Sequence, residues 1–105
     1  GGGEDDYFTT RWLYDNLALV MPRKVGAAGA GVPLLRAMIN SNRETFAVIL
    51  ADLTGFDHLG DHLNAMELVD GVVLVANAGT SREEDLRRLD MQIPPEKNLG
   101  VLLLG

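Results

Sequence analysis

The sequence of 105 residues predicts one α/β domain, residues 1–105, with a mainly parallel sheet of about four strands and flanking helices. Two observations support this fold class. Short apolar runs alternate along the chain with segments of helical periodicity. The apolar runs are continuous, which is typical of parallel strands buried on both faces. The length suits one domain and not comfortably two.

The first predicted element is a helix within residues 4–21, "EDDYFTTRWLYDNLALVM". Acidic residues at positions 4–6 suit a helix N-terminus, and Pro22 would end the helix. One apolar side would hold Tyr7, Trp12, Leu13, Leu17 and Val20. Residues 1–6 are expected to be a flexible lead-in or a cloning remnant.

The middle of the chain predicts a strand, a helix and a second strand. Lys24 to Ala28 could form a short strand that runs into a glycine-rich turn. Pro33 suits the first turn of a helix that continues to Asn42. The clearest strand is "TFAVILAD", residues 45–52, which is rich in apolar and β-branched residues.

The second half continues the alternation. A loop and a short helix are expected within residues 53–69, followed by a strand from Val72 to Ala76 whose central Val73 should be buried on both faces. A helix over residues 82–92 follows, and "LGVLLLG" at residues 99–105 is the last strand. For the last helix, the sequence predicts a cap by Thr80 or Ser81 with Glu83 or Glu84, and termination by Pro94 and Pro95.

Composition narrows the function. The net charge of −6 disfavours nucleic acid and anionic membrane as partners. With no cysteine, the chain has no disulfide, thiolate nucleophile or cysteine-ligated metal. No apolar run approaches the length of a membrane span, and the first residues lack a signal-peptide pattern, so we expect a cytoplasmic domain without membrane insertion. Because the chain stops directly after an apolar run, we expect a fragment of a longer protein.

Asp52 is the first candidate site residue, because it ends the strand 45–52. Open α/β sheets place ligands at the carboxyl ends of their strands, where such an aspartate can hold Mg²⁺. The alternative is that Asp52 caps the turn that follows.

Two further motifs allow a functional interpretation. Gly26, Gly29 and Gly31 precede a helix, where backbone amides could hold phosphate, but their spacing departs from the dinucleotide fingerprint and a flexible turn explains them better. His58 and His62 are four residues apart, with Asp57 and Asp61 close by, as metal ligands on a helix would be.

The histidine pair lacks the glutamate of zinc proteases, and Gly60 weakens a helix there, so a solvated polar surface is the favoured interpretation. Nucleophilic catalysis has little support, because neither Ser41 nor Ser81 lies in a nucleophile-elbow pattern.

Several segments within residues 23–105 resemble one family. "FAVILAD" followed by a Thr-Gly turn, then "ELVDGVVLVANAGTSREEDLRRL", then "NLGVLLLG", resemble the later half of the deviant-Walker P-loop ATPase superfamily. The closest resemblance is to the bacterial tyrosine autokinases of exopolysaccharide export and their co-polymerase relatives. It implies a truncated P-loop-NTPase-like (Rossmann-like) fold, with Asp52 at the Walker B position.

Departures from the family pattern set the functional prediction. The chain contains no Gly-Lys-Ser/Thr loop, and the tyrosine-rich tail is absent. Asp52 is followed by Leu53, Thr54 and Gly55, where the family has Thr-Pro-Pro. Without a phosphate-binding loop and lysine, a magnesium aspartate cannot support phosphoryl transfer. We therefore expect no catalytic residue, no cofactor and a vestigial metal position at Asp52.

The resulting prediction is a non-catalytic regulatory or structural domain with a protein partner in a polysaccharide-export assembly. It could be the cytoplasmic part of a membrane-associated protein. A homodimer is also expected, with Trp12 of the first helix near its interface. One alternative is a fragment of an active ATPase or tyrosine kinase whose Walker A part is missing. Another is a receiver-like signalling domain with Asp52 as phosphoacceptor, although the acidic pair and the lysine of such domains are absent.

Overall fold

The computed structural model describes residues 8–22, 31–56 and 60–105. The chain divides into two compact units, residues 1–52 and residues 53–105, which are described one at a time. The expected strand from Lys24 to Ala28 lies outside the described residues. No helix among the described residues combines the length and the apolar character needed to cross a membrane.

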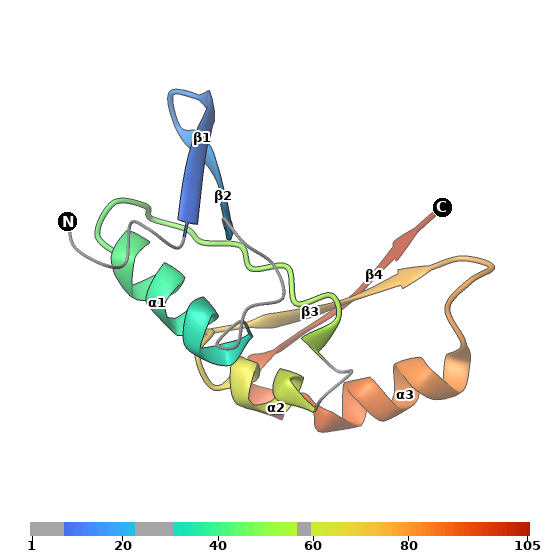
Figure 1. Ribbon diagram of the computed structural model, residues 1–105. Coiled ribbons are helices and arrows are strands. Elements are labelled where there is room, and N and C mark those ends of the chain that lie inside the picture. The colour runs from blue at the N-terminus through green and yellow to red at the C-terminus, as the bar shows by residue number, and fades with distance from the viewer. Residues whose placement is uncertain (1–7, 23–30, 57–59) are drawn as a thin grey trace. The chain divides into compact units, whose positions relative to one another are not determined.

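The first unit contains an antiparallel hairpin of β1 (Phe8–Tyr14) and β2 (Leu17–Pro22) (Figure 1). The predicted helix within residues 4–21 is therefore wrong over its described part. The β-branched and aromatic residues of this segment favour strands, and Asp15 and Asn16 are turn formers placed between two apolar runs. The capping acids and the partial helical periodicity were outweighed by this turn and by cross-strand pairing.

Helix α1 (Val32–Asn42) follows in the first unit and confirms the helix predicted from Pro33. Gly31 precedes it with φ of 88°, a backbone conformation that favours glycine, and a proline occupies the first turn. Leu35 is its buried residue. At the other end, the Asn42 side-chain amide donates to the Met38 carbonyl at 2.7 Å. The Asn42 side chain thus supplies a hydrogen-bond donor to a carbonyl of the last turn of the helix.

The segment that follows α1 is extended but is not a strand. Residues 46–53 belong to no sheet, so the strand predicted over residues 45–52 is not formed. Within the described part of the chain, residues 47–51 make no backbone hydrogen bond, and the Leu50 side chain is 93% exposed. The apolar and β-branched residues of this segment favour a strand, but a strand also needs a neighbouring strand with which to exchange hydrogen bonds.

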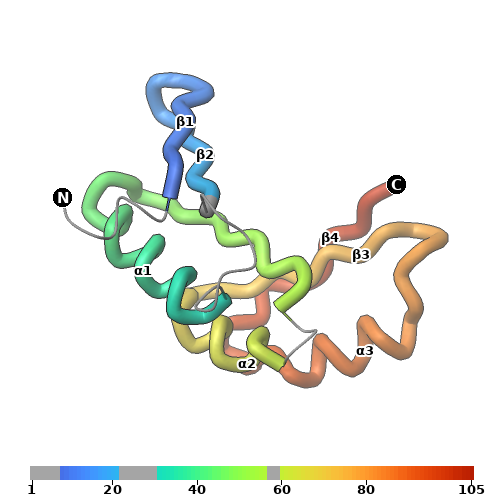
Figure 2. The backbone as a smooth tube through the Cα atoms, viewed as in Figure 1, coloured from blue at the N-terminus to red at the C-terminus, as the bar shows by residue number. Residues whose placement is uncertain are grey.

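The second unit contains α2 (Asp61–Met66), β3 (Val72–Asn77), α3 (Glu83–Gln92), the short 3₁₀ helix η3 (Pro95–Lys97) and β4 (Asn98–Leu104). Strands β3 and β4 pair in parallel, with α3 as the connection between them, and α3 contacts β3. Figure 2 follows the chain from yellow β3 through orange α3 to red β4. The helices α2 and α3 and the strands β3 and β4 were predicted from the sequence, whereas η3 was not.

A small core stabilises the second unit. Ala65 and Met66 of α2, Ala76 of β3 and Ile93 after α3 are its buried apolar residues. The Lys97 ammonium donates to the Met66 carbonyl at 2.9 Å, which links η3 to the end of α2. Val73, which we predicted to be buried, is 48% exposed instead. Helix α3 contacts β3, but about half of Val73 remains exposed.

The fold class is therefore mixed α/β. The described residues hold two separate two-stranded sheets, one antiparallel and one parallel, in place of a single sheet of about four strands. The parallel part of the prediction is represented by β3 and β4.

Candidate functional site

Asp52 lies in the extended segment that was predicted to be a strand. Its side chain is exposed, and a turn at Thr54 and Gly55 follows it. The Phe56 amide donates to the Leu53 carbonyl at 3.0 Å, and Gly55 adopts φ of 90°, which suits glycine in such a turn. Among the described residues, no group of three or more Asp, Glu or His side chains is arranged to hold a metal ion. The metal role of Asp52 stays a prediction.

Of the two histidines, His62 is described, whereas His58 and Asp57 lie outside the described residues. His62 is on α2, and its Nε2 is 2.8 Å from Oε1 of Gln92 at the end of α3. A neutral ring that donates from Nε2 leaves Nδ1 as an acceptor, and Nδ1 is buried without a partner among the described residues. The ring thus joins two helices, which is a structural role.

The turn from β3 to α3 lies at the carboxyl end of a parallel strand, where α/β proteins often bind ligands. The Asn77 amide donates to the Ser81 hydroxyl at 2.8 Å, and the Ala78 amide donates to the Leu104 carbonyl at 2.9 Å. Arg82 is the N-cap of α3 and makes no side-chain cap. The predicted capping box is therefore wrong, because Ser81 is engaged with Asn77 instead.

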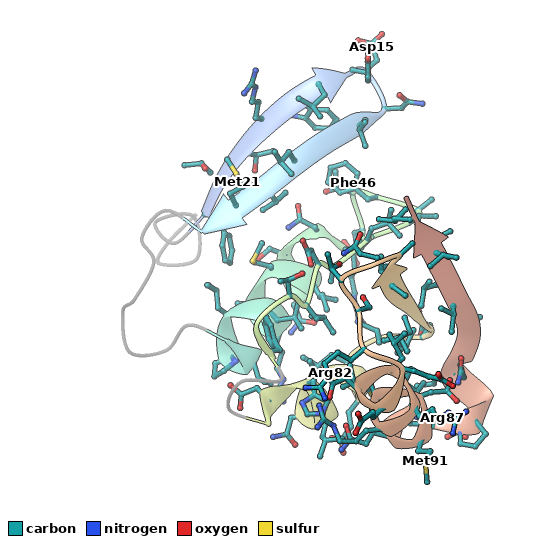
Figure 3. The ribbon with its side chains drawn as sticks, turned by 90° about the vertical axis from the view of Figure 1, so that its right-hand side faces the viewer. Asp15, Met21, Phe46, Arg82, Arg87 and Met91 are labelled. Atoms are coloured by element: carbon teal, nitrogen blue, oxygen red, sulfur yellow. The ribbon has the colours of Figure 1, made fainter. Side chains whose placement is uncertain are left out.

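Charges on α3 argue against an anion site at this turn. The first turn holds Glu83, Glu84 and Asp85, which repel phosphate from the helix N-terminus. Arginines of this region pair with these acids. Arg87 is 2.7 Å from Glu83, and Arg82 is 3.2 Å from Glu84, all on the surface. Figure 3 labels Arg82 and Arg87, which lie on and beside α3. These residues form a solvated helix surface.

The glycine-rich segment contributes one described residue, Gly31, at the start of α1. Gly26 and Gly29 lie outside the described residues. The first turn of α1 holds no acidic residue, but no second feature at Gly31 indicates a ligand.

The hairpin tip holds a feature that our sequence analysis missed. Trp12, Leu13, Tyr14 and Asp15 line a shallow surface hollow of about 430 Å³. The sequence signal was present, because Asp15 and Asn16 separate two strand-like runs by two residues, as a tight hairpin does. We interpreted the same residues as the middle of a helix.

The chain was compared with protein-family models, with curated proteins and with solved structures, and none of the three comparisons found a match.

Proposed function

We propose that this chain is a non-catalytic regulatory or structural module related to the tyrosine autokinases of exopolysaccharide export. One observation carries the proposal. Residues 70–92, which hold the most specific part of the resemblance, fold as a strand, a turn and a helix, and β4 returns parallel to β3. A parallel βαβ unit is the arrangement that this family resemblance implies at that position.

The non-catalytic part of the proposal rests on the residue types present. A P-loop enzyme holds the β- and γ-phosphates with a glycine-rich loop and a lysine, and its Walker B aspartate acts only beside them. The sequence has no Gly-Lys-Ser/Thr, and its two lysines are Lys24 and Lys97. Lys97 is engaged with the Met66 carbonyl. Asp52 therefore remains as a Walker-B-like position without the phosphate-binding residues.

The proposal includes a larger parallel sheet in the functional protein, P-loop-NTPase-like and truncated. The larger sheet is supported by one property of residues 47–51 and by one property of strands β3 and β4. Residues 47–51 form an extended apolar segment without backbone hydrogen bonds among the described residues. Strands β3 and β4 each have one edge that is unpaired in the described part of the chain. A two-stranded sheet is marginal in water, so additional strands would stabilise this one.

The proposed setting is a cytoplasmic polysaccharide-export assembly, where the module binds a protein partner and forms a homodimer. Exposed apolar strands support an associating role. Leu99, Val101 and Leu103 of β4 are largely exposed, and no charged residue interrupts this strand. An edge without charge or proline invites pairing with another chain.

Calorimetry with ATP and Mg²⁺ tests the non-catalytic role. We expect no detectable binding by the 105-residue chain. Micromolar affinity would require about 8 kcal/mol of binding free energy and would support the alternative of an enzyme fragment.

The assembly role has a separate test. The chain is mixed with the cytoplasmic domain of an exopolysaccharide co-polymerase protein, and sedimentation equilibrium measures the mass of the mixture. A complex is expected at protein concentrations of about 100 µM, because weak interfaces of this kind have micromolar dissociation constants. Two independent species at that concentration would contradict the proposed partner.

A further inference from the structure

We propose that the peptide bond between Leu50 and Ala51 is a processing site for an endoprotease whose main specificity pocket binds an apolar side chain. The site lies in residues 47–51, the extended segment that follows α1 (Figure 1). Water is the co-reactant: the C–N bond breaks, Leu50 gains a carboxylate and Ala51 gains an amine. The site does not require the function proposed above, but pairing of this segment in the larger sheet would close it.

The backbone of residues 47–51 is available to a protease. Among the described residues, this segment makes no backbone hydrogen bond. A peptide that binds to a protein as an added strand forms main-chain hydrogen bonds with it, so its own N–H and C=O groups must be free. A helix or a paired strand must first open locally before it can bind in this way. Residues 47–51 need no such opening.

The side chains of this segment suit recognition by apolar pockets. Leu50 is 93% exposed, and Val48, two residues earlier, is 73% exposed. In an extended substrate, side chains two residues apart fall on the same side. Pockets for alternate side chains give strand-like recognition its specificity. Leu50 therefore fits the main pocket beside the cleaved bond, and Val48 fits a second apolar pocket.

The segment is anchored on both sides. Before it, the Phe46 amide donates to the Asn42 carbonyl at 3.1 Å, and the Phe46 ring centroid is 5.6 Å from that of Trp12. After it, the Phe56 amide donates to the Leu53 carbonyl at 3.0 Å. These contacts restrict the ends of the segment before a protease arrives, so less conformational freedom is lost on binding.

Cleavage after Leu50 would fall beside the boundary between the two compact units, residues 1–52 and residues 53–105. The products would be residues 1–50, which contain β1, β2 and α1, and residues 51–105, which contain every element from α2 to β4. No described helix or strand is cut. Exposed connecting segments of this kind are the preferred places at which proteases nick folded proteins.

Two other apolar residues separate the effect of an exposed side chain from that of a free backbone. Met91 is 84% exposed but lies in the helix α3. Leu19 is 43% exposed but lies in β2, where it is paired with Arg11 of β1. If an exposed side chain were sufficient, Met91 would be cleaved about as readily as Leu50. A requirement for a free backbone predicts cleavage after Leu50.

Limited proteolysis of the 105-residue chain with chymotrypsin, followed by mass spectrometry, tests the site. Chymotrypsin cleaves after leucine, methionine and aromatic residues, so its pocket accepts all three residues compared above. We expect the fragments 1–50 and 51–105 to form at least about tenfold faster than any fragment cut after Leu19 or Met91, because those elements must open first.

Two variants of one position test the role of the Leu50 side chain. Leu50→Asp should slow cleavage of this bond by at least about tenfold, because an apolar pocket rejects a carboxylate. Leu50→Phe is the matched control, and it should keep the cleavage rate within about threefold because the new side chain is apolar. The position is exposed, so neither change should unfold the chain, and circular dichroism checks this.

Three results would overturn the processing site. They are the absence of cleavage after Leu50, cleavage after Leu19 or Met91 that is as fast as cleavage after Leu50, and equal cleavage rates at position 50 for Leu50→Asp and Leu50→Phe. None of them bears on the non-catalytic role, which calorimetry with ATP and Mg²⁺ tests separately.

Discussion

At the scale of single residues, burial differs sharply along one strand. Ala76 is 2% exposed, whereas Val73, three positions earlier on β3, is 48% exposed. Side chains alternate along a strand, so these two residues point to opposite faces, and α3 contacts β3. The same apolar composition thus gives a core position and a bare position. We therefore expect the stability of the second unit to depend strongly on Ala76, although its side chain is only a methyl group.

Ala76→Asp tests that dependence. A carboxylate at this buried position loses its hydration, so we expect the free energy of unfolding to fall by about 3 kcal/mol or more. The control Ala78→Asp makes the same change at an exposed position and should cost less than about 0.5 kcal/mol. Urea denaturation followed by circular dichroism measures both. Equal midpoints for the two variants would mean that the Ala76 face is not a core.

At the scale of elements, the described residues leave the sheet of the parallel βαβ unit only partly covered. Helix α3 contacts β3, but Val73 and Val75 are about half exposed. The buried residues of the second unit are few, and three of them lie in or next to α2 and α3. Parallel sheets in proteins are normally covered on both faces. The partial exposure of this βαβ unit therefore supports the proposal that further strands and helices join its sheet.

Val73→Asp distinguishes a bare sheet from a covered one. If the larger sheet forms, a carboxylate at Val73 is buried without a partner, and we expect a loss of about 3 kcal/mol or more, enough to prevent folding of a small domain. Val73→Thr is the control, because its similar shape should cost only about 1 kcal/mol. A cooperative melt of Val73→Asp close to that of Val73→Thr would show that this face stays open and would contradict the larger sheet.

At the scale of the whole molecule, the two units each expose apolar strands. In the first unit, Leu19 and Met21 of β2 are exposed, and in the second, every apolar residue of β4 from Val101 onward is exposed. Apolar surface of this kind favours association. The argument that placed Trp12 on a helical interface no longer applies, because Trp12 lies in β1. The homodimer itself stays a proposal, now supported by the uncharged edge of β4.

Sedimentation equilibrium at about 100 µM tests self-association, a concentration at which micromolar dimers are populated. We expect a mass near twice the 11.4 kDa of the chain. Leu103→Lys places a charge on β4 and should shift the mass toward the monomer, because a lysine blocks edge pairing. Met91→Lys makes the same change on α3, where Met91 is exposed, and should leave the dimer intact. A monomeric parent, or equal masses for both variants, would contradict the β4 interface.

The sequence by itself determined the elements whose signals are local. Helix α1 begins with a proline at a favourable position, and α3 ends before Pro94. Strand β3 is rich in valine, and β4 is rich in leucine. Such patterns specify an element because its hydrogen bonds or its preferred backbone angles lie within a few neighbouring residues. The absence of a Gly-Lys-Ser/Thr loop and the position of Asp52 in the pattern were likewise visible in the sequence.

Only the tertiary structure decided the features that depend on contacts between segments distant in the sequence. The segment from Phe8 to Pro22 has partial helical periodicity and strand-forming residues, and cross-strand pairing selects the hairpin. Residues 46–52 have strong strand propensity but belong to no sheet in the described structure, and Val73 is 48% exposed. The hollow lined by residues 12–15 lies at the tip of this hairpin, which the helix prediction did not include. Pairing and burial are non-local, so a local pattern permits them without fixing them.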